Sequence, residues 1–399
     1  MNIPILRIPF DEEDREFIHK GMDEILASGM LTMGKYTRQF EDLFAKFTGA
    51  KYCVAVSNGT AALEIILRAL GIENSSVIVP TNTFLATAFA VIHSGNQVIF
   101  ADSDPETLCL TVDDVKRRIR PDTRAVMLVH IGGIITPEVS RLRQLCEEQG
   151  LALIEDCAHA HGCALDGEQA GTFGIGGAFS FFPTKVVTTG EGGMITTGDE
   201  TVYRRALMIR NHGKNPDRGN RMSEVGHNQR LSEFTALLGV QQMQKARELI
   251  EDRRRVAQDY DEALKGVEGV RPVVLPEGLF SSYYKYIAYL DERYDRAQVK
   301  RMMKDRYSVS LTGEVYSDLC HTEPVWDQYT YCGRQRQDGR VACSRWPACG
   351  CDKSPGSFPG AEYISRHHIC LPLYRGLSRA EVAYIVDSLQ KTLLELGGK

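Results

Sequence analysis

Apolar residues recur at two different spacings over the first two hundred residues of the chain. Spacings of three and four residues predict helices, here over 11–28, 40–47, 61–70, 113–119, 137–149 and 202–211. Short apolar runs bounded by polar or glycine residues predict strands, here over 52–56, 77–79, 98–101, 125–129, 151–154, 179–182 and 194–197. Strands that alternate with helices in this way indicate an α/β fold with a doubly wound, mostly parallel sheet flanked by helices.

The pattern changes in the last third of the chain. Residues 231–264 read as one or two long helices. Beyond them, we expect strands over 270–275, 283–290 and 309–311 and helices over 296–307 and 378–396. The sequence therefore predicts a large domain over residues 1–250 and a smaller α+β domain over residues 251–399.

Composition and charge narrow the class of protein. The chain of 399 residues has a net charge of −5, which provides no basic field for nucleic acid or an anionic membrane. Its acidic N-terminal stretch does not resemble a signal peptide, and no run approaches the roughly eighteen apolar residues of a membrane span. Eleven cysteines in a long chain without a secretion signal favour a reduced, cytoplasmic location.

Two charged residues lie at the ends of neighbouring predicted strands. Asp156 follows the strand 151–154, where open α/β sheets place their ligands, and Lys185 follows the strand 179–182 in a turn led by Pro183. A lysine amine can form a Schiff base with a carbonyl cofactor, and a carboxylate can keep a pyridine nitrogen protonated. Taken singly, Lys185 could be a solvated charge and Asp156 a turn or helix-capping residue.

The motifs around these two residues resemble those of a known family. SFFPTK followed by TTGEGGM, downstream of IEDCAHAHG, is similar to the DegT/DnrJ/EryC1/StrS family of sugar aminotransferases that depend on pyridoxal 5′-phosphate. The resemblance runs from about Ile8 to Leu396 and implies the type I aminotransferase fold, like that of aspartate aminotransferase, with the cofactor in the large domain. It also implies a homodimer that transfers an amino group from glutamate or glutamine to a nucleotide-linked keto-deoxysugar, in amino-sugar biosynthesis.

The resemblance assigns catalytic roles to three residues. Lys185 would hold the cofactor as a Schiff base and, once released, move the proton between donor and cofactor. Asp156 would keep the ring nitrogen protonated, so that the ring acts as an electron sink. His159 would contact the ring or its phenolic oxygen. A branch of the family has His in place of this lysine and dehydrates its substrates, and Lys185 argues against that branch.

Further residues would bind the cofactor by the same resemblance. Gly59 allows close approach of a ligand, and Thr60 opens a helix whose free N–H groups attract an anion. Cofactor-binding roles therefore fall on Gly59, Thr60, the backbone of Ala61, Phe84, Ser180 and Asn228. Phe84 would stack on the ring, and Asn228 would reach the phosphate of the neighbouring subunit. The simpler alternatives are an ordinary helix cap and a core phenylalanine.

The resemblance also places two residues near the site of the sugar acceptor. Tyr316 and His321 lie where the family borders its sugar site, although both could be structural. A keto-cyclitol is the competing acceptor.

The segment Tyr331–Pro359 departs from the family. Cys332, Cys343, Cys349 and Cys351 could hold a structural zinc in a non-catalytic relative. The short spacing of the last two and the scarcity of apolar residues favour a surface insertion without metal, near the sugar-binding mouth. We also expect no metal at His159 and His161.

Overall fold

The structure is a computed structural model that describes residues 1–8, 10–311, 313–327, 334–335, 341–342 and 357–397. A seven-stranded sheet of order β1-β9-β8-β5-β4-β2-β3 forms its centre. The strands are β1 (Tyr52–Val56), β2 (Ser76–Pro80), β3 (Gln97–Ala101), β4 (Thr123–Val129), β5 (Ala152–Asp156), β8 (Gly176–Ser180) and β9 (Gly193–Thr197). Neighbouring strands are parallel from β3 to β8, and β9 is antiparallel to both β8 and β1. The predicted fold class is confirmed.

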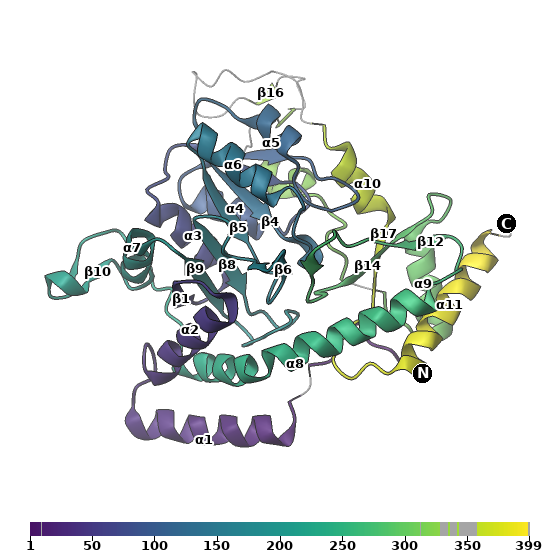
Figure 1. The fold of residues 1–399 in the computed structure, drawn as a ribbon, viewed down its shortest axis with the longest axis horizontal. Helices are drawn as coiled ribbons and strands as arrows, with labels where there is room; N and C mark the ends of the chain where they lie inside the picture. The colour runs from purple at the N-terminus through teal and green to yellow at the C-terminus, as the bar shows by residue number, and fades with distance from the viewer. Residues whose placement is uncertain (9, 312, 328–333, 336–340, 343–356, 398–399) are drawn as a thin grey trace.

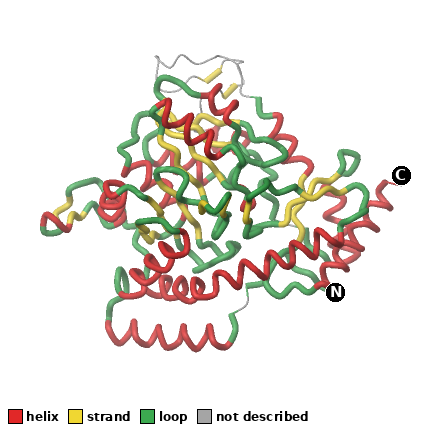
Figure 2. The backbone as a smooth tube through the Cα atoms, viewed as in Figure 1, coloured by secondary structure: helices red, strands yellow, loops and turns green. Residues whose placement is uncertain are grey.

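Helices cover both faces of this sheet. Alternate strand residues enter opposite cores: Val54 and Val56 pack on one side, Cys53 and Ala55 on the other. One core contains α3 (Gly59–Ala69), α4 (Ala86–His93) and α7 (Glu200–Arg210). The other contains α2 (Lys35–Thr48), α5 (Val112–Arg118), α6 (Val139–Gln149) and the first half of α8 (Glu233–Ala263), with α1 (Glu12–Ser28) packed outside. Figure 2 shows the strands inside this helical shell.

The helix α8 joins the large sheet to a smaller one (Figure 1). It is one continuous helix, and the predicted domain boundary at residue 250 falls within it. The smaller sheet, β12 (Val270–Pro272), β14 (Tyr286–Leu290) and β17 (His368–Leu371), is antiparallel in the order β12-β14-β17. Helices α8, α9 (Arg296–Tyr307) and α11 (Arg379–Gly397) cover its outer face.

Short elements complete the described part of the chain. They are β6 (Ala164–Leu165), β7 (Glu168–Gln169), β10 (Lys214–Asn215), β11 (Arg221–Met222), β13 (Leu279–Phe280), β15 (Arg334–Gln335), β16 (Val341–Ala342) and α10 (Pro359–His367). The predicted strand over 309–311 is wrong, because Val309 forms only an isolated bridge to Ile3. Among the described residues, no helix is long and apolar enough to cross a membrane.

Parallel pairing sets where the polar strand ends meet. Asp156 and Ser180 are the last residues of the parallel neighbours β5 and β8. The end of β1 lies at the same edge, because β1 and β8 are both antiparallel to β9. The loop after β8 and the first turn of α3 therefore border one region, outside the carboxyl ends of the strands.

A buried glutamate ties α8 to the start of α2. Gly34 at the N-terminus of α2 has no side-chain cap. Instead, the Glu233 carboxylate accepts hydrogen bonds from the N–H groups of Gly34, Tyr36 and Thr37, at 2.8, 2.7 and 2.9 Å. An acidic group at a helix N-terminus satisfies free donors and opposes the helix dipole.

Replacement of Glu233 should therefore destabilise the protein. We expect Glu233→Ala to lower the free energy of unfolding by on the order of 3 kcal/mol, because several buried N–H groups lose a charged acceptor. Denaturant unfolding followed by circular dichroism measures the change. Glu251→Ala, an exposed position on the same helix, is the control and should change stability little. Equal stability of the two variants would contradict this account of the α2 terminus.

Candidate active site

A cavity of about 830 Å³ lies at the carboxyl edge of the large sheet. Segments far apart in the chain line it: the start of α3, the loop before α4, the end of β5, the β8–β9 loop, and tyrosines from the C-terminal third. The structure brings these sequence-predicted residues together there: Gly59, Thr60, Ala61, Phe84, Asp156, His159, Ser180, Lys185 and Tyr316.

The Asp156 carboxylate is held in one orientation. One oxygen accepts a hydrogen bond from the N–H of Ala158 at 3.1 Å, and the other accepts one from the Thr87 hydroxyl at 2.7 Å. The Thr83 hydroxyl lies 2.9 Å from that of Thr87, so two threonines four residues apart support the carboxylate. Sequence reasoning missed this pair, although the spacing in TNTFLAT was a usable signal.

The surroundings of the Lys185 amine lower its pKa. The pKa of Lys185 is lowered to about 8: burial has the largest effect and lowers it, the Asp156 carboxylate raises it, and the nearby Lys285 ammonium lowers it. Its Nζ lies 4.8 Å from the centre of the Tyr284 ring. Near neutral pH a sizeable fraction of this amine is unprotonated, which is the form that attacks a carbonyl carbon.

The first turn of α3 forms one end of the cavity. The helix begins at Gly59, and Asn58, which the sequence analysis did not single out, caps it by accepting the N–H of Ala61 at 2.8 Å. A Cβ atom on Gly59 would lie 2.9 Å from that of Ser180, so glycine is required for α3 to approach the end of β8. The positive end of the helix dipole and the Ser180 hydroxyl together suit an anion.

Aromatic side chains form the mouth and one wall. Phe84 precedes α4, is 61% exposed, and its ring centre lies 5.9 Å from that of Tyr316. The buried His159 ring stacks on Tyr284, with centroids 3.9 Å apart and an interplanar angle of 12°. Its Nδ1 accepts the N–H of Gly132 at 3.3 Å, and its Nε2 lies 3.2 Å from the Tyr316 hydroxyl.

Two other predicted site residues, His321 and Asn228, lie outside the lining of this cavity. His321 is outside the cavity lining: its Nδ1 lies 2.6 Å from the Thr81 hydroxyl and its ring packs on Phe358. Asn228 does not line the cavity of its own chain, and its backbone bridges Asn211. His161 is buried among aromatic rings.

Cys332, Cys343, Cys349 and Cys351 lie outside the described residues, so the choice between zinc and a metal-free insertion stays a prediction. Within the described ranges, only His130, Glu155 and Cys157 group as metal ligands could. Glu155 there accepts the N–H groups of Gly171 and Gly174 at 2.7 and 2.8 Å, which is a structural use of that carboxylate.

Sequence reasoning also missed two residues of the wall. Tyr284 belongs to the run SSYYKY, which read only as part of a strand, and Gln229 follows Asn228 directly. The Gln229 side chain contacts the Ser57 hydroxyl beside the α3 terminus. For Gln229 the available signal was its position directly after Asn228, whereas Tyr284 adjoins no residue that the sequence had indicated.

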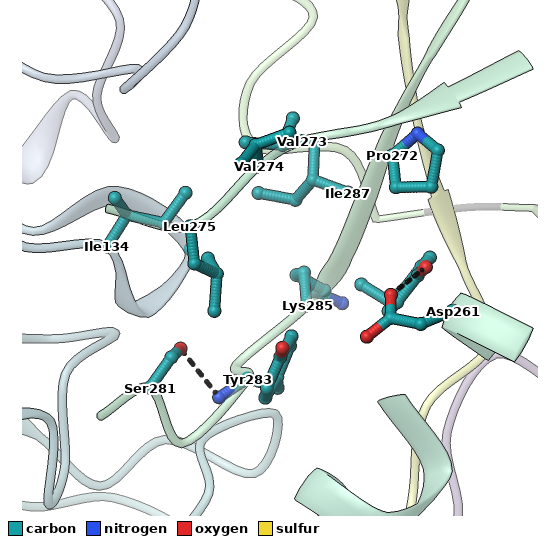
Figure 3. Close-up of a pocket in the computed structure, with 12 residues that line it drawn as sticks. Ile134, Asp261, Pro272, Val273, Val274, Leu275, Ser281, Tyr283, Lys285 and Ile287 are labelled. Carbon is teal, nitrogen blue, oxygen red and sulfur yellow. Dashed lines mark hydrogen bonds between the residues drawn. The ribbon is translucent and has the colours of Figure 1, made fainter. Parts of the chain in front are cut away.

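A second, smaller cavity of about 310 Å³ lies between the large domain and the small sheet (Figure 3). Gly132 and Ile134 line it from one side, and Val273, Lys285 and Ile287 from the other. The Lys285 ammonium, 5.2 Å from the centre of the Tyr284 ring, has no hydrogen-bond or ion-pair partner among the described residues. Burial lowers its pKa.

The chain is similar to known aminotransferases over most of its length. Residues 12–346 match the model of the DegT/DnrJ/EryC1/StrS aminotransferase family. The chain is 36% identical over 294 residues to a GDP-perosamine synthase of Vibrio cholerae, covering 73% of this chain and 79% of that protein. It is 34% identical over 387 residues to a dTDP-4-dehydro-2,3,6-trideoxy-D-glucose 4-aminotransferase of Saccharopolyspora spinosa, covering 93% and 92%.

Solved structures show the same fold. The aminotransferase TlmJ from Streptoalloteichus hindustanus superimposes with a TM-score of 0.84 at 29% identity, covering 99% of this chain and 100% of that one. DesI, solved in the presence of its TDP-sugar product, superimposes with a TM-score of 0.83 at 28% identity, covering 95% and 90%.

The electrostatic effect of Lys285 on Lys185, two partly buried lysines, can be tested. We expect Lys285→Met to raise the pKa of Lys185 from about 8 toward the usual lysine range, because loss of a nearby positive charge favours the ammonium form. The measurement is the pH dependence of Lys185 labelling by an amine-reactive reagent in protein freed of bound aldehydes, read by peptide mass spectrometry. Lys304→Met, an exposed position in the same part of the chain, should leave the profile unchanged. A Lys285→Met profile identical to wild type would refute the electrostatic link.

Proposed function

The chain belongs to the DegT/DnrJ/EryC1/StrS aminotransferase family, and we propose that it transfers an amino group from glutamate or glutamine to a nucleotide-linked keto-deoxysugar. Aminotransferases of this family depend on pyridoxal 5′-phosphate. One observation carries the proposal: an amine with a lowered pKa, on Lys185, and an oriented carboxylate, on Asp156, share one open cavity.

The chemistry of the cavity fits this cofactor. The Asp156 carboxylate suits a protonated pyridine nitrogen, and the α3 terminus with Ser180 suits a phosphate. Phe84 offers an exposed ring face for stacking. When bound, pyridoxal phosphate supplies an electron sink that stabilises negative charge on the donor's α-carbon.

Lys185 and Asp156 would then bind and orient the cofactor, and they would hold or move protons. Lys185 would hold the cofactor covalently and, when free, its Nζ would take the proton from the donor's α-carbon and deliver it to the cofactor carbon. Asp156 would keep the proton on the ring nitrogen, supported in its orientation by Thr87. The size of the cavity, about 830 Å³, leaves room for a sugar beside the cofactor.

We further propose that the active form is a homodimer. Residues 211–228, which include β10 and β11, project from the body of the molecule at the left of Figure 1. Met222 and Val225 on this arm are 69% and 82% exposed, which favours burial against another subunit. Asn228 at the base of the arm would complete the phosphate site of the partner subunit.

The substrate proposal is tested by a screen. Purified protein is incubated with keto-sugar nucleotides or keto-cyclitols and with either glutamate or glutamine, and the aminated products are detected by mass spectrometry. We expect amination of at least one keto-sugar nucleotide, and none with Lys185→Ala, because no other described residue in the cavity carries an amine. Amination of cyclitols alone would overturn the nucleotide-sugar assignment.

The dimer proposal is tested by mixing two inactive variants. If Asn228 acts across the interface, subunit exchange between Lys185→Ala and Asn228→Ala proteins yields heterodimers with one intact site and one doubly altered site. Activity should then return to at most about a quarter of the wild-type value per subunit, since random exchange makes half of the dimers mixed and one of their two sites intact. Native mass spectrometry of differently tagged chains verifies exchange. No recovered activity despite exchange would show that Asn228 does not act in the partner's site.

A further inference from the structure

The hydrogen bonds of His159 determine which of its nitrogens carries the proton. The backbone N–H of Gly132 points at Nδ1 from 3.3 Å, and a backbone N–H can only donate. Nδ1 must therefore present its lone pair. Glycine is required at position 132, because φ there is 66° and a Cβ atom would lie 2.5 Å from the Ile287 side chain.

His159 is also a neutral imidazole. Burial lowers its pKa well below the usual range, and the positive charges of Lys185 and Lys285 act in the same direction. Protonation of Nδ1 would in addition turn an accepted hydrogen bond into a clash between two N–H groups. Stacking on Tyr284 prevents the ring from turning away. The single proton of the neutral ring therefore lies on Nε2.

This tautomer fixes the direction of the hydrogen bond between His159 and Tyr316. The Nε2–H group has to donate to the Tyr316 hydroxyl oxygen, 3.2 Å away. Burial raises the pKa of Tyr316 well above its usual value, so the hydroxyl keeps its own hydrogen. No described residue accepts that hydrogen, and Tyr316 lines the large cavity together with Lys185 and Phe84.

We propose that the Tyr316 hydroxyl is an obligate hydrogen-bond donor to an oxygen of the molecule bound in this cavity, with its direction set by the chain Gly132 N–H, His159, Tyr316. The partner is an acceptor oxygen: the ketone oxygen of the sugar or the phenolic oxygen of the cofactor. The choice between these two rests on the proposed function, whereas the hydrogen-bond direction does not.

The direction has a consequence for substrate discrimination if the partner is the ketone. A hydroxyl whose oxygen already accepts from His159 and whose hydrogen needs an acceptor favours a carbonyl oxygen over the ammonium group that replaces it, since the ammonium has no lone pair to offer. Tyr316 would then bind the keto-sugar more tightly than the aminated product, which favours product release.

The first test reads the tautomer directly. Nitrogen-15 NMR of the full chain as purified, labelled at histidine, distinguishes a protonated from an unprotonated ring nitrogen, and His159→Gln assigns the signals. We expect an unprotonated Nδ1 and a protonated Nε2 at neutral pH, with the Nε2 signal shifted in Tyr316→Phe. A proton on Nδ1, or a charged ring, would overturn the proposal even if the protein is an aminotransferase.

The second test locates the acceptor oxygen. Tyr316→Phe keeps the ring and removes the hydroxyl, and loss of one such hydrogen bond should weaken binding about tenfold. Weaker cofactor binding identifies the phenolic oxygen, whereas a raised KM for the keto-sugar with an unchanged donor half-reaction identifies the ketone. Tyr363→Phe, a tyrosine outside the cavity, is the control. Unchanged cofactor affinity together with an unchanged KM would overturn the proposal.

Discussion

Parallel pairing of β5 with β8 is the constraint on which the site depends. Because the two strands run in the same direction, their carboxyl ends meet at one edge, and Asp156 and Ser180 come to lie there. The chain then returns through β9, antiparallel to both neighbours, so the β8–β9 loop with Lys185 has to turn over the same edge. If β8 ran in the opposite direction, Ser180 and Lys185 would lie at the other edge of the sheet from Asp156.

Burial then gives these polar groups their chemistry. The low dielectric of the cavity disfavours charge on Lys185, and the Lys285 ammonium, 5.2 Å from the centre of the Tyr284 ring, also disfavours it. The Asp156 carboxylate opposes both effects and is itself satisfied by a hydroxyl and a backbone N–H. The effects of burial and Lys285 are thus opposed by that of Asp156, and the pKa of Lys185 comes to about 8.

The wall formed by His159, Tyr284 and Tyr316 is equally determined by packing. Stacking fixes the plane of the imidazole, and the Gly132 N–H fixes which nitrogen accepts. Tyr284 and Tyr316 come from the C-terminal part of the chain, so that part contributes to the orientation of a residue next to β5. Groups from both parts of the chain therefore share one hydrogen-bond chain.

The sequence by itself determined the fold class and the positions of Asp156 and Lys185 relative to their strands, because both follow from apolar periodicity and from local motifs. It also indicated Gly59, Thr60 and Phe84, which lie beside recognisable turns. It did not identify Thr87, Tyr284 or Lys285, whose side chains have ordinary local surroundings, and it predicted a strand at 309–311 where the chain has only a bridge to Ile3. Only the tertiary structure decided the pKa of Lys185, the tautomer of His159 and the exclusion of His321 from the cavity. The physical reason is that burial and hydrogen-bond direction depend on residues that are distant in sequence, whereas periodicity reports only on neighbours.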